Sequence, residues 1–134
     1  MRNKKGFTLS ELLIVVAIIG VLVAISIPIF TSQLHKAEVA TDWANVRAYY
    51  AQIQYEFIET NKINDSYLHS IDSGVGLKSF EMNGQTISLK AGSCYVAREY
   101  HDNTTQDYVV GYNVLYMCDH LHEHPQCELV LPND

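Results

Sequence analysis

Apolar and polar residues divide the chain into a continuous apolar run, a stretch with helical periodicity and a stretch with strand-like patterns. From Phe7 to Phe30, Glu11 is the only ionisable side chain. This run of 24 residues would measure about 36 Å as an α-helix, enough to cross a hydrocarbon core of about 30 Å. Three basic residues (Arg2, Lys4, Lys5) precede it, as expected on the cytoplasmic side of a membrane segment. We therefore predict a transmembrane helix over residues 7–30.

The helix is expected to continue over residues 31–60, beyond a kink at Pro28, because apolar residues recur there in steps of three and four. They form two stripes on opposite sides of the helix. We expect the alanine-rich stripe to pack closely on the chain's own sheet and the aromatic stripe to contact other subunits. One wide buried face is the alternative. The alanine stripe comprises Phe30, Leu34, Ala37, Thr41, Ala44, Ala48, Ala51, Tyr55 and Ile58, and the aromatic stripe comprises Val39, Trp43, Val46, Tyr50, Ile53 and Phe57.

Residues 61–134 have the signals of a small sheet. Polar and turn residues between Asn61 and Gly76 end the helix. Asn83-Gly84 lies between two short apolar segments and predicts a hairpin with a type I′ turn. Further strands are predicted at 94–97, 108–116 and 128–131. The expected fold class is α+β, with one long N-terminal helix packed on a small antiparallel sheet of about four strands.

The N-terminus resembles that of a type IV prepilin. The resemblance rests on a short basic leader ending in Gly6, then Phe7, Glu11 and an apolar run with Pro28, and it covers residues 1 to about 48. Ser10, where the family more often has an apolar residue, is a departure. The region 28–48 looks closest to prepilins of Gram-positive type. A secretory signal peptide is the alternative, but Glu11 would then interrupt its apolar region.

The resemblance implies that a prepilin peptidase cuts between Gly6 and Phe7 and methylates the new amine of Phe7. Residues 1–6 are then a cleaved leader, 7–30 a transmembrane and assembly helix, 31–60 its amphipathic continuation and 61–134 a globular head. In pilins of this type the stretch between Gly20 and Pro28 can loosen during assembly; close helix packing is the other explanation for Gly20.

Glu11 is expected to act in assembly. Inserting a carboxylate at bilayer depth costs about 2.5–3.5 kcal/mol, so we expect Glu11 to have a partner. Cleavage gives Phe7 a cationic α-amine, and the two charges would attract by about 4 kcal/mol at 4 Å and an effective dielectric constant near 20. The partner amine can belong to the same chain or to a neighbouring subunit, and the resemblance implies the neighbour.

The three cysteines follow residue 90 and suit an exported domain with one disulfide. Cys118–Cys127 and Cys94–Cys118 are both candidate pairings. Three histidines at alternate positions (His120, His122 and His124) are a candidate metal site. The candidate is weak, because an extended strand spaces these side chains too widely for all three to reach one ion. We expect no cofactor.

The charge balance and the absence of certain motifs limit the classes of function that fit this sequence. Removing residues 1–6 leaves six basic residues against fifteen acids, a net charge of −9, which does not favour binding of nucleic acid. The sequence contains no nucleotide-binding motif and no nucleophile motif that would indicate an enzyme. The resemblance predicts a structural pilin subunit of an adhesion, motility or DNA-uptake filament, with a secretion pseudopilin as the near alternative. A membrane-anchored metal-binding or redox protein is the alternative from another class.

The resemblance also implies the partners and the location. The expected partners are further copies of the chain, the prepilin peptidase, a membrane platform protein of the assembly machine and the lipid bilayer. We expect a single-pass protein of the cytoplasmic membrane before assembly and an extracellular filament afterwards.

Overall fold

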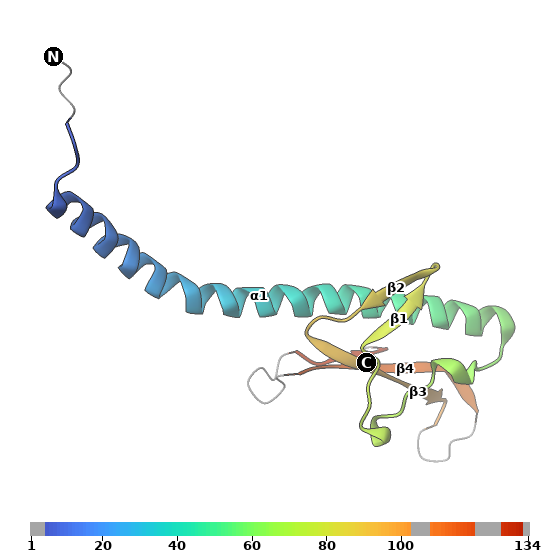
Figure 1. Cartoon of the computed structure of the whole chain (residues 1–134). Helices are drawn as coiled ribbons and strands as arrows, with labels where there is room; N and C mark the ends of the chain where they lie inside the picture. Colours follow the sequence, from blue (N-terminus) through green and yellow to red (C-terminus); the bar gives the residue numbers. More distant parts are fainter. Residues whose placement is uncertain (1–4, 103–107, 120–126, 133–134) are drawn as a thin grey trace. The chain divides into compact units, whose positions relative to one another are not determined.

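The computed structural model describes residues 5–102, 108–119 and 127–132 and divides the chain into two compact units, Met1–Lys36 and Ala37–Asp134. One helix, α1 (Leu9–Thr60, 52 residues), contributes to both units (Figure 1). The helix continues through Pro28, as expected. The hydroxyl of Ser26 donates to the Leu22 carbonyl at 2.7 Å and that of Thr31 donates to the Pro28 carbonyl at 3.1 Å, so both polar groups are satisfied within the helix.

The predicted hairpin is present in the second unit. Strands β1 (Ser79–Met82) and β2 (Gln85–Ser88) pair antiparallel. The turn residues Asn83 and Gly84 have positive φ angles of 52° and 76°, which a type I′ turn requires. The hairpin forms a two-stranded sheet of its own, so the expectation of one sheet of about four strands was wrong. The β1 residue Phe80 stacks on Tyr49 of α1 with ring centroids 4.2 Å apart, which fixes the hairpin on the helix.

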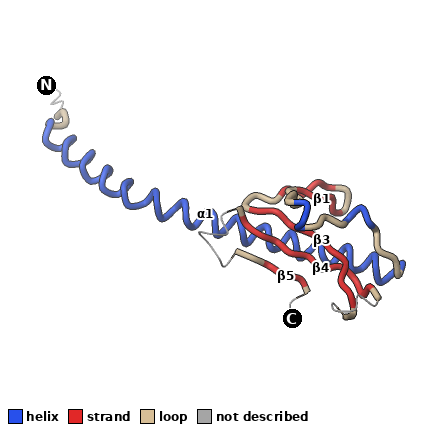
Figure 2. The backbone as a smooth tube through the Cα atoms, turned by 90° about the horizontal axis from the view of Figure 1, so that it is seen from below, coloured by secondary structure: helices blue, strands red, loops and turns tan. Residues whose placement is uncertain are grey.

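A second, three-stranded sheet has the order β3-β4-β5. Its antiparallel strands are β3 (Gly92–Tyr100), β4 (Val109–Cys118) and β5 (Leu129–Leu131), close to the predicted segments. The connection from α1 contains two short 3-10 helices, η1 (Asp65–Tyr67) and η2 (Ile71–Ser73). Residues on either side of η2 pair with β3 through the single bridges His69–Val96 and Leu77–Cys94, so the outer edge of β3 is partly covered (Figure 2).

The core of the second unit lies between α1 and the three-stranded sheet. The aromatic stripe faces this core, whereas the alanine stripe is exposed from Ala37 to Ile58. The predictions that the alanine stripe packs on the sheet and that the aromatic stripe contacts other subunits were therefore wrong. Large side chains gain more from leaving water, at about 25 cal/mol per Å² of apolar surface, than alanines do.

The α+β class is confirmed. The helix residues Val39, Val46, Tyr49, Ile53 and Phe57 are buried together with Val96, Tyr112, Val114 and Tyr116 of the sheet.

Candidate processing and assembly site

The predicted cleavage site lies just before the start of α1. Residues Lys5 to Thr8 are exposed and have no regular secondary structure. The side chain of Phe7 is 87% exposed. A Cβ atom added at Gly6 would meet nothing within 4 Å. The packing of this chain therefore does not require glycine at position 6, and any such requirement has to come from a partner.

Glu11 lies in the first turn of α1 and is hydrogen-bonded within its own chain. The backbone N–H of Thr8 donates to the Glu11 carboxylate at 2.8 Å, and the N–H of Glu11 donates to the Thr8 hydroxyl at 3.4 Å. These reciprocal bonds form a capping box, which satisfies two backbone donors at a helix start. The sequence analysis missed this role of Thr8, although the Thr8-x-x-Glu11 spacing is the known signature of the motif.

Gly20 and Pro28 lie in the first part of α1, several helical turns after Glu11, so neither is close to its carboxylate. A Cβ atom at Gly20 would meet nothing within 4 Å. The large apolar side chains around them are 47–68% exposed between Leu12 and Phe30. By length and composition α1 can cross a membrane. An apolar surface exposed on every side needs lipid or protein around it.

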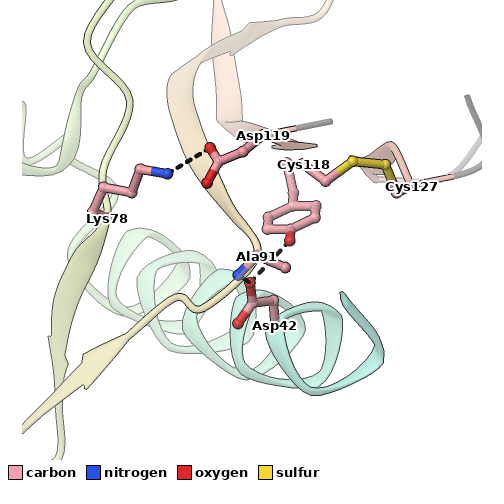
Figure 3. Close-up of a disulfide and its surroundings, with 7 residues drawn as sticks. Asp42, Lys78, Ala91, Cys118, Asp119 and Cys127 are labelled. Atoms are coloured by element: carbon pink, nitrogen blue, oxygen red, sulfur yellow. Dashed lines mark hydrogen bonds and ion pairs between the residues drawn. A yellow bond between two sulfur atoms is a disulfide. The ribbon is translucent and has the colours of Figure 1, made fainter. Parts of the chain in front are cut away.

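In the second unit, one carboxylate joins the helix to the sheet. Asp42 on α1 is fully buried and accepts a hydrogen bond from the N–H group of Ala91 at 2.8 Å (Figure 3). It also accepts hydrogen bonds from the N–H group of Lys90 (2.9 Å) and from the hydroxyl of Tyr116 (2.9 Å). Burial, followed by the bond to Asp42, raises the pKa of the Tyr116 hydroxyl, so this hydroxyl remains a donor. A Cβ atom at Gly92 would collide with the backbone oxygen of Met117 and with the Tyr116 ring, so glycine is needed where this ring passes.

The disulfide joins Cys118, at the end of β4, to Cys127, with Cα atoms 5.7 Å apart (Figure 3). The alternative pairing with Cys94 does not fit the strand register. Cys94 lies opposite Tyr116 and Cys118 lies opposite Gly92, and such diagonal positions are about 7–8 Å apart, beyond the reach of a disulfide. Cys94 is free and buried, and burial raises the pKa of its thiol to about 12. The candidate metal ligands His120, His122 and His124 lie outside the described residues.

Comparison with known proteins gives a family match at the N-terminus and several relatives that are matched over longer stretches. The family model "Prokaryotic N-terminal methylation motif" matches residues 1–27. The type IV wide pilus major component PilA4 of Thermus thermophilus is 34% identical over 100 residues, which cover 72% of this chain and 75% of the relative. The type IV major pilin protein PilA of Myxococcus xanthus is 35% identical over 94 residues, or 70% of this chain and 41% of the relative.

A third relative, the type IV narrow pilus major component PilA5 of Thermus thermophilus, is 54% identical over 50 residues, which cover 35% of this chain and 43% of the relative. Several relatives are thus matched over less than half of their own length. No solved structure matches the chain. The match to the wide-pilus component extends well beyond the methylation motif, and the chain therefore belongs to the type IV pilin family.

Proposed function

We propose that this chain is a structural subunit that is cut after Gly6, methylated on the amine of Phe7 and polymerised into a type IV pilus-like filament. One observation carries the proposal: the first unit is an apolar helix exposed on all sides, with a single acid in its first turn. Such a surface is compatible with lipid before assembly and with the apolar helices of other copies afterwards. The three relatives described above are all type IV pilus components, which supports the same function.

The start of the chain suits processing by a peptidase. The segment from Lys5 to Thr8 is exposed and non-helical, so its backbone is accessible to an enzyme. Gly6 has free space around it in the chain itself, which leaves the peptidase as the partner that selects a residue without a side chain. The three basic residues of the leader stay in the cytoplasm while the helix crosses the membrane, which gives a single-pass precursor.

Assembly then requires contacts along α1. The alanine stripe is exposed in the second unit, and its small side chains permit another backbone to come close. The new amine of Phe7 is a partner for Glu11, within the chain or in a neighbouring copy, and methylation keeps its positive charge. The remaining partners are the prepilin peptidase, the membrane assembly platform and the lipid bilayer.

Processing and polymerisation are tested together by expressing the full chain with a prepilin peptidase and a pilus assembly machine. Filaments sheared from the cells should contain chains that begin at Phe7 and carry one added methyl group, as read by intact mass. A Gly6→Val variant should accumulate as the uncut precursor in the membrane fraction. Filaments built from chains that retain Met1 to Gly6 would contradict the proposal, and so would a processed chain that never leaves the membrane.

A further inference from the structure

Arg47 presents a positive charge at a fixed place on the outer side of α1. Its side chain is exposed, and its guanidinium carbon lies 5.7 Å from the centroid of the Trp43 ring. Trp43 is half-buried against the core of the second unit, so the ring itself is held in place. A cation above an aromatic face is attracted by the negative face of the ring, which restricts the otherwise flexible arginine.

This charge has no carboxylate partner among the described residues. The two ion pairs there join Lys78 to Asp119 and Arg98 to Asp65. The positions three and four residues from Arg47, which are its neighbours on the helix surface, are Trp43, Ala44, Tyr50 and Ala51, and none is acidic. No acid of the described residues therefore competes with a carboxylate of another copy for this guanidinium.

Charge balance makes an available cation valuable in contacts between copies. From Ala37 to Asp134 the chain has 14 acidic residues (the total of 15 without Glu11) and five basic ones (the total of nine without Arg2, Lys4, Lys5 and Lys36), a net charge of −9. Two copies therefore repel each other on average. Among the described residues Lys78 and Arg98 are paired with acids of their own chain, whereas Arg47, Lys62 and Lys90 are not.

Of these three cations, Arg47 borders the exposed alanine stripe. It precedes Ala48 in the sequence and lies one helical turn from both Ala44 and Ala51. A second copy that covers the stripe would shield Arg47 from water and strengthen its attraction to a carboxylate. The planar guanidinium also matches the geometry of a carboxylate with two parallel hydrogen bonds.

From this combination we infer that Arg47 binds a carboxylate of a second copy at the edge of the subunit contact, and that Trp43 positions it for this bond. The inference rests on the proposed function, because it needs copies that polymerise. It adds a defined electrostatic contact on the second unit to the apolar packing of the helices. The pair orients neighbouring heads and discriminates against partners with a basic edge.

The test compares full-length Arg47→Gln, Arg47→Glu and Arg47→Lys with a matched control, Lys62→Gln, which removes one exposed cation just after the C-terminal end of α1. Filament yield is measured after shearing, and each chain is checked by its resistance to protease. Arg47→Gln should lower subunit association by about 2- to 5-fold and Arg47→Glu by about tenfold, whereas Lys62→Gln should match the parent. Arg47→Lys should retain most of the yield because it keeps the charge.

Salt supplies a readout that a purely structural role would not change. Raising the ionic strength of a filament suspension from about 0.15 to 1 M shortens the screening length from about 8 to 3 Å. The difference in subunit release between the parent and Arg47→Gln should then shrink, because screening weakens the ion pair in the parent alone, whereas it weakens the general repulsion between copies in both. Co-expressing Arg47→Glu with a lysine substitution at one exposed acid (Glu59, Glu81 or Glu128) should restore assembly when that acid is the partner.

The outcomes separate this inference from the function on which it rests. If the parent polymerises and both the Gln and Glu variants assemble equally well with the same salt dependence, the role of Arg47 is wrong and the pilin function stands. The same holds if Lys62→Gln loses as much as Arg47→Gln, since net charge alone would then explain the loss. If the parent forms no filament, the proposed function fails, and this inference fails with it.

Discussion

The carboxylate of Asp42 on α1 accepts a 2.9 Å hydrogen bond from the hydroxyl of Tyr116 on β4. Both side chains are completely buried. The same carboxylate accepts bonds from the N–H groups of Lys90 and Ala91, which lie at the turn into β3. One helical residue thus fixes the position of two parts of the head, and the apolar contacts around it fill the remaining space.

Removing this carboxylate should destabilise the head. Asp42→Ala leaves two backbone donors and one hydroxyl without their acceptor, so the free energy of unfolding should fall by about 2–4 kcal/mol. Tyr116→Phe removes a single bond and should cost about 1 kcal/mol. Urea unfolding followed by tryptophan fluorescence measures both. Glu59→Ala, an exposed acid on the same helix, is the control and should stay within about 0.5 kcal/mol of the parent; an equal loss there would argue against a special role for Asp42.

The buried thiol of Cys94 should resist modification. Burial raises its pKa from 9.0 to about 12, so the folded head favours the neutral thiol. The stability linked to this group is complete below about pH 9 and is lost as the pH rises toward 12. Iodoacetamide at pH 8 should therefore add nothing to the native protein and one adduct after unfolding in urea, as read by mass spectrometry. Rapid labelling of the native chain would show that Cys94 is accessible, and Cys94→Ala supplies the blank.

Deleting residues 1–30 should release a soluble head. The core residues of the second unit lie between Val39 and Leu131, so the deletion removes none of them, and it removes the exposed apolar segment. The fragment should sediment as a monomer and unfold cooperatively in urea. The half-buried Trp43 should show a red shift of its fluorescence only on unfolding. A fragment that is unfolded at the start would mean that the first unit contributes to the stability of the second.

The sequence predicted the elements better than their packing. The run from Phe7 to Phe30 and the Asn83-Gly84 turn have strong local signals, because length, hydropathy and positive φ angles are properties of neighbouring residues. The two stripes of α1 were both recognised, but the stripe that packs on the sheet is the aromatic one and not the alanine one. Periodicity tells which residues share a face and does not tell what that face contacts.

The residues missed by sequence reasoning are polar ones whose role depends on distant or unnoticed partners. Asp42 lies between the two apolar stripes in the sequence, and an acid at such a position is usually solvated, so the pattern alone does not predict its burial. Its burial depends on donors at residues 90, 91 and 116, which the sequence does not bring together. Thr8 is different, since its partner Glu11 is only three residues away and the capping-box spacing was available to be found.

Glu11 can act by capping the start of α1 or through its charge, and the capping box allows these two roles to be tested separately. Glutamine occupies the third position of such boxes as well as glutamate, so Glu11→Gln keeps the cap and removes the charge. Thr8→Val keeps the charge and removes the hydroxyl that accepts the Glu11 N–H, at a cost of about 0.5–2 kcal/mol to the helix start. Glu11→Asp keeps the charge with a shorter reach. The three variants therefore vary cap and charge separately.

If Glu11 recruits subunits through the amine of Phe7, Glu11→Gln should insert in the membrane and be cut nearly normally but yield few filaments. Glu11→Asp should then lose part of the yield, and Thr8→Val should keep most of it, because the carboxylate survives there. Uncut precursor is measured by intact mass and filaments by shearing. The opposite ranking, in which Thr8→Val is the most damaging and Glu11→Gln assembles like the parent, would assign Glu11 to capping and leave assembly to the apolar packing of Leu12 to Phe30.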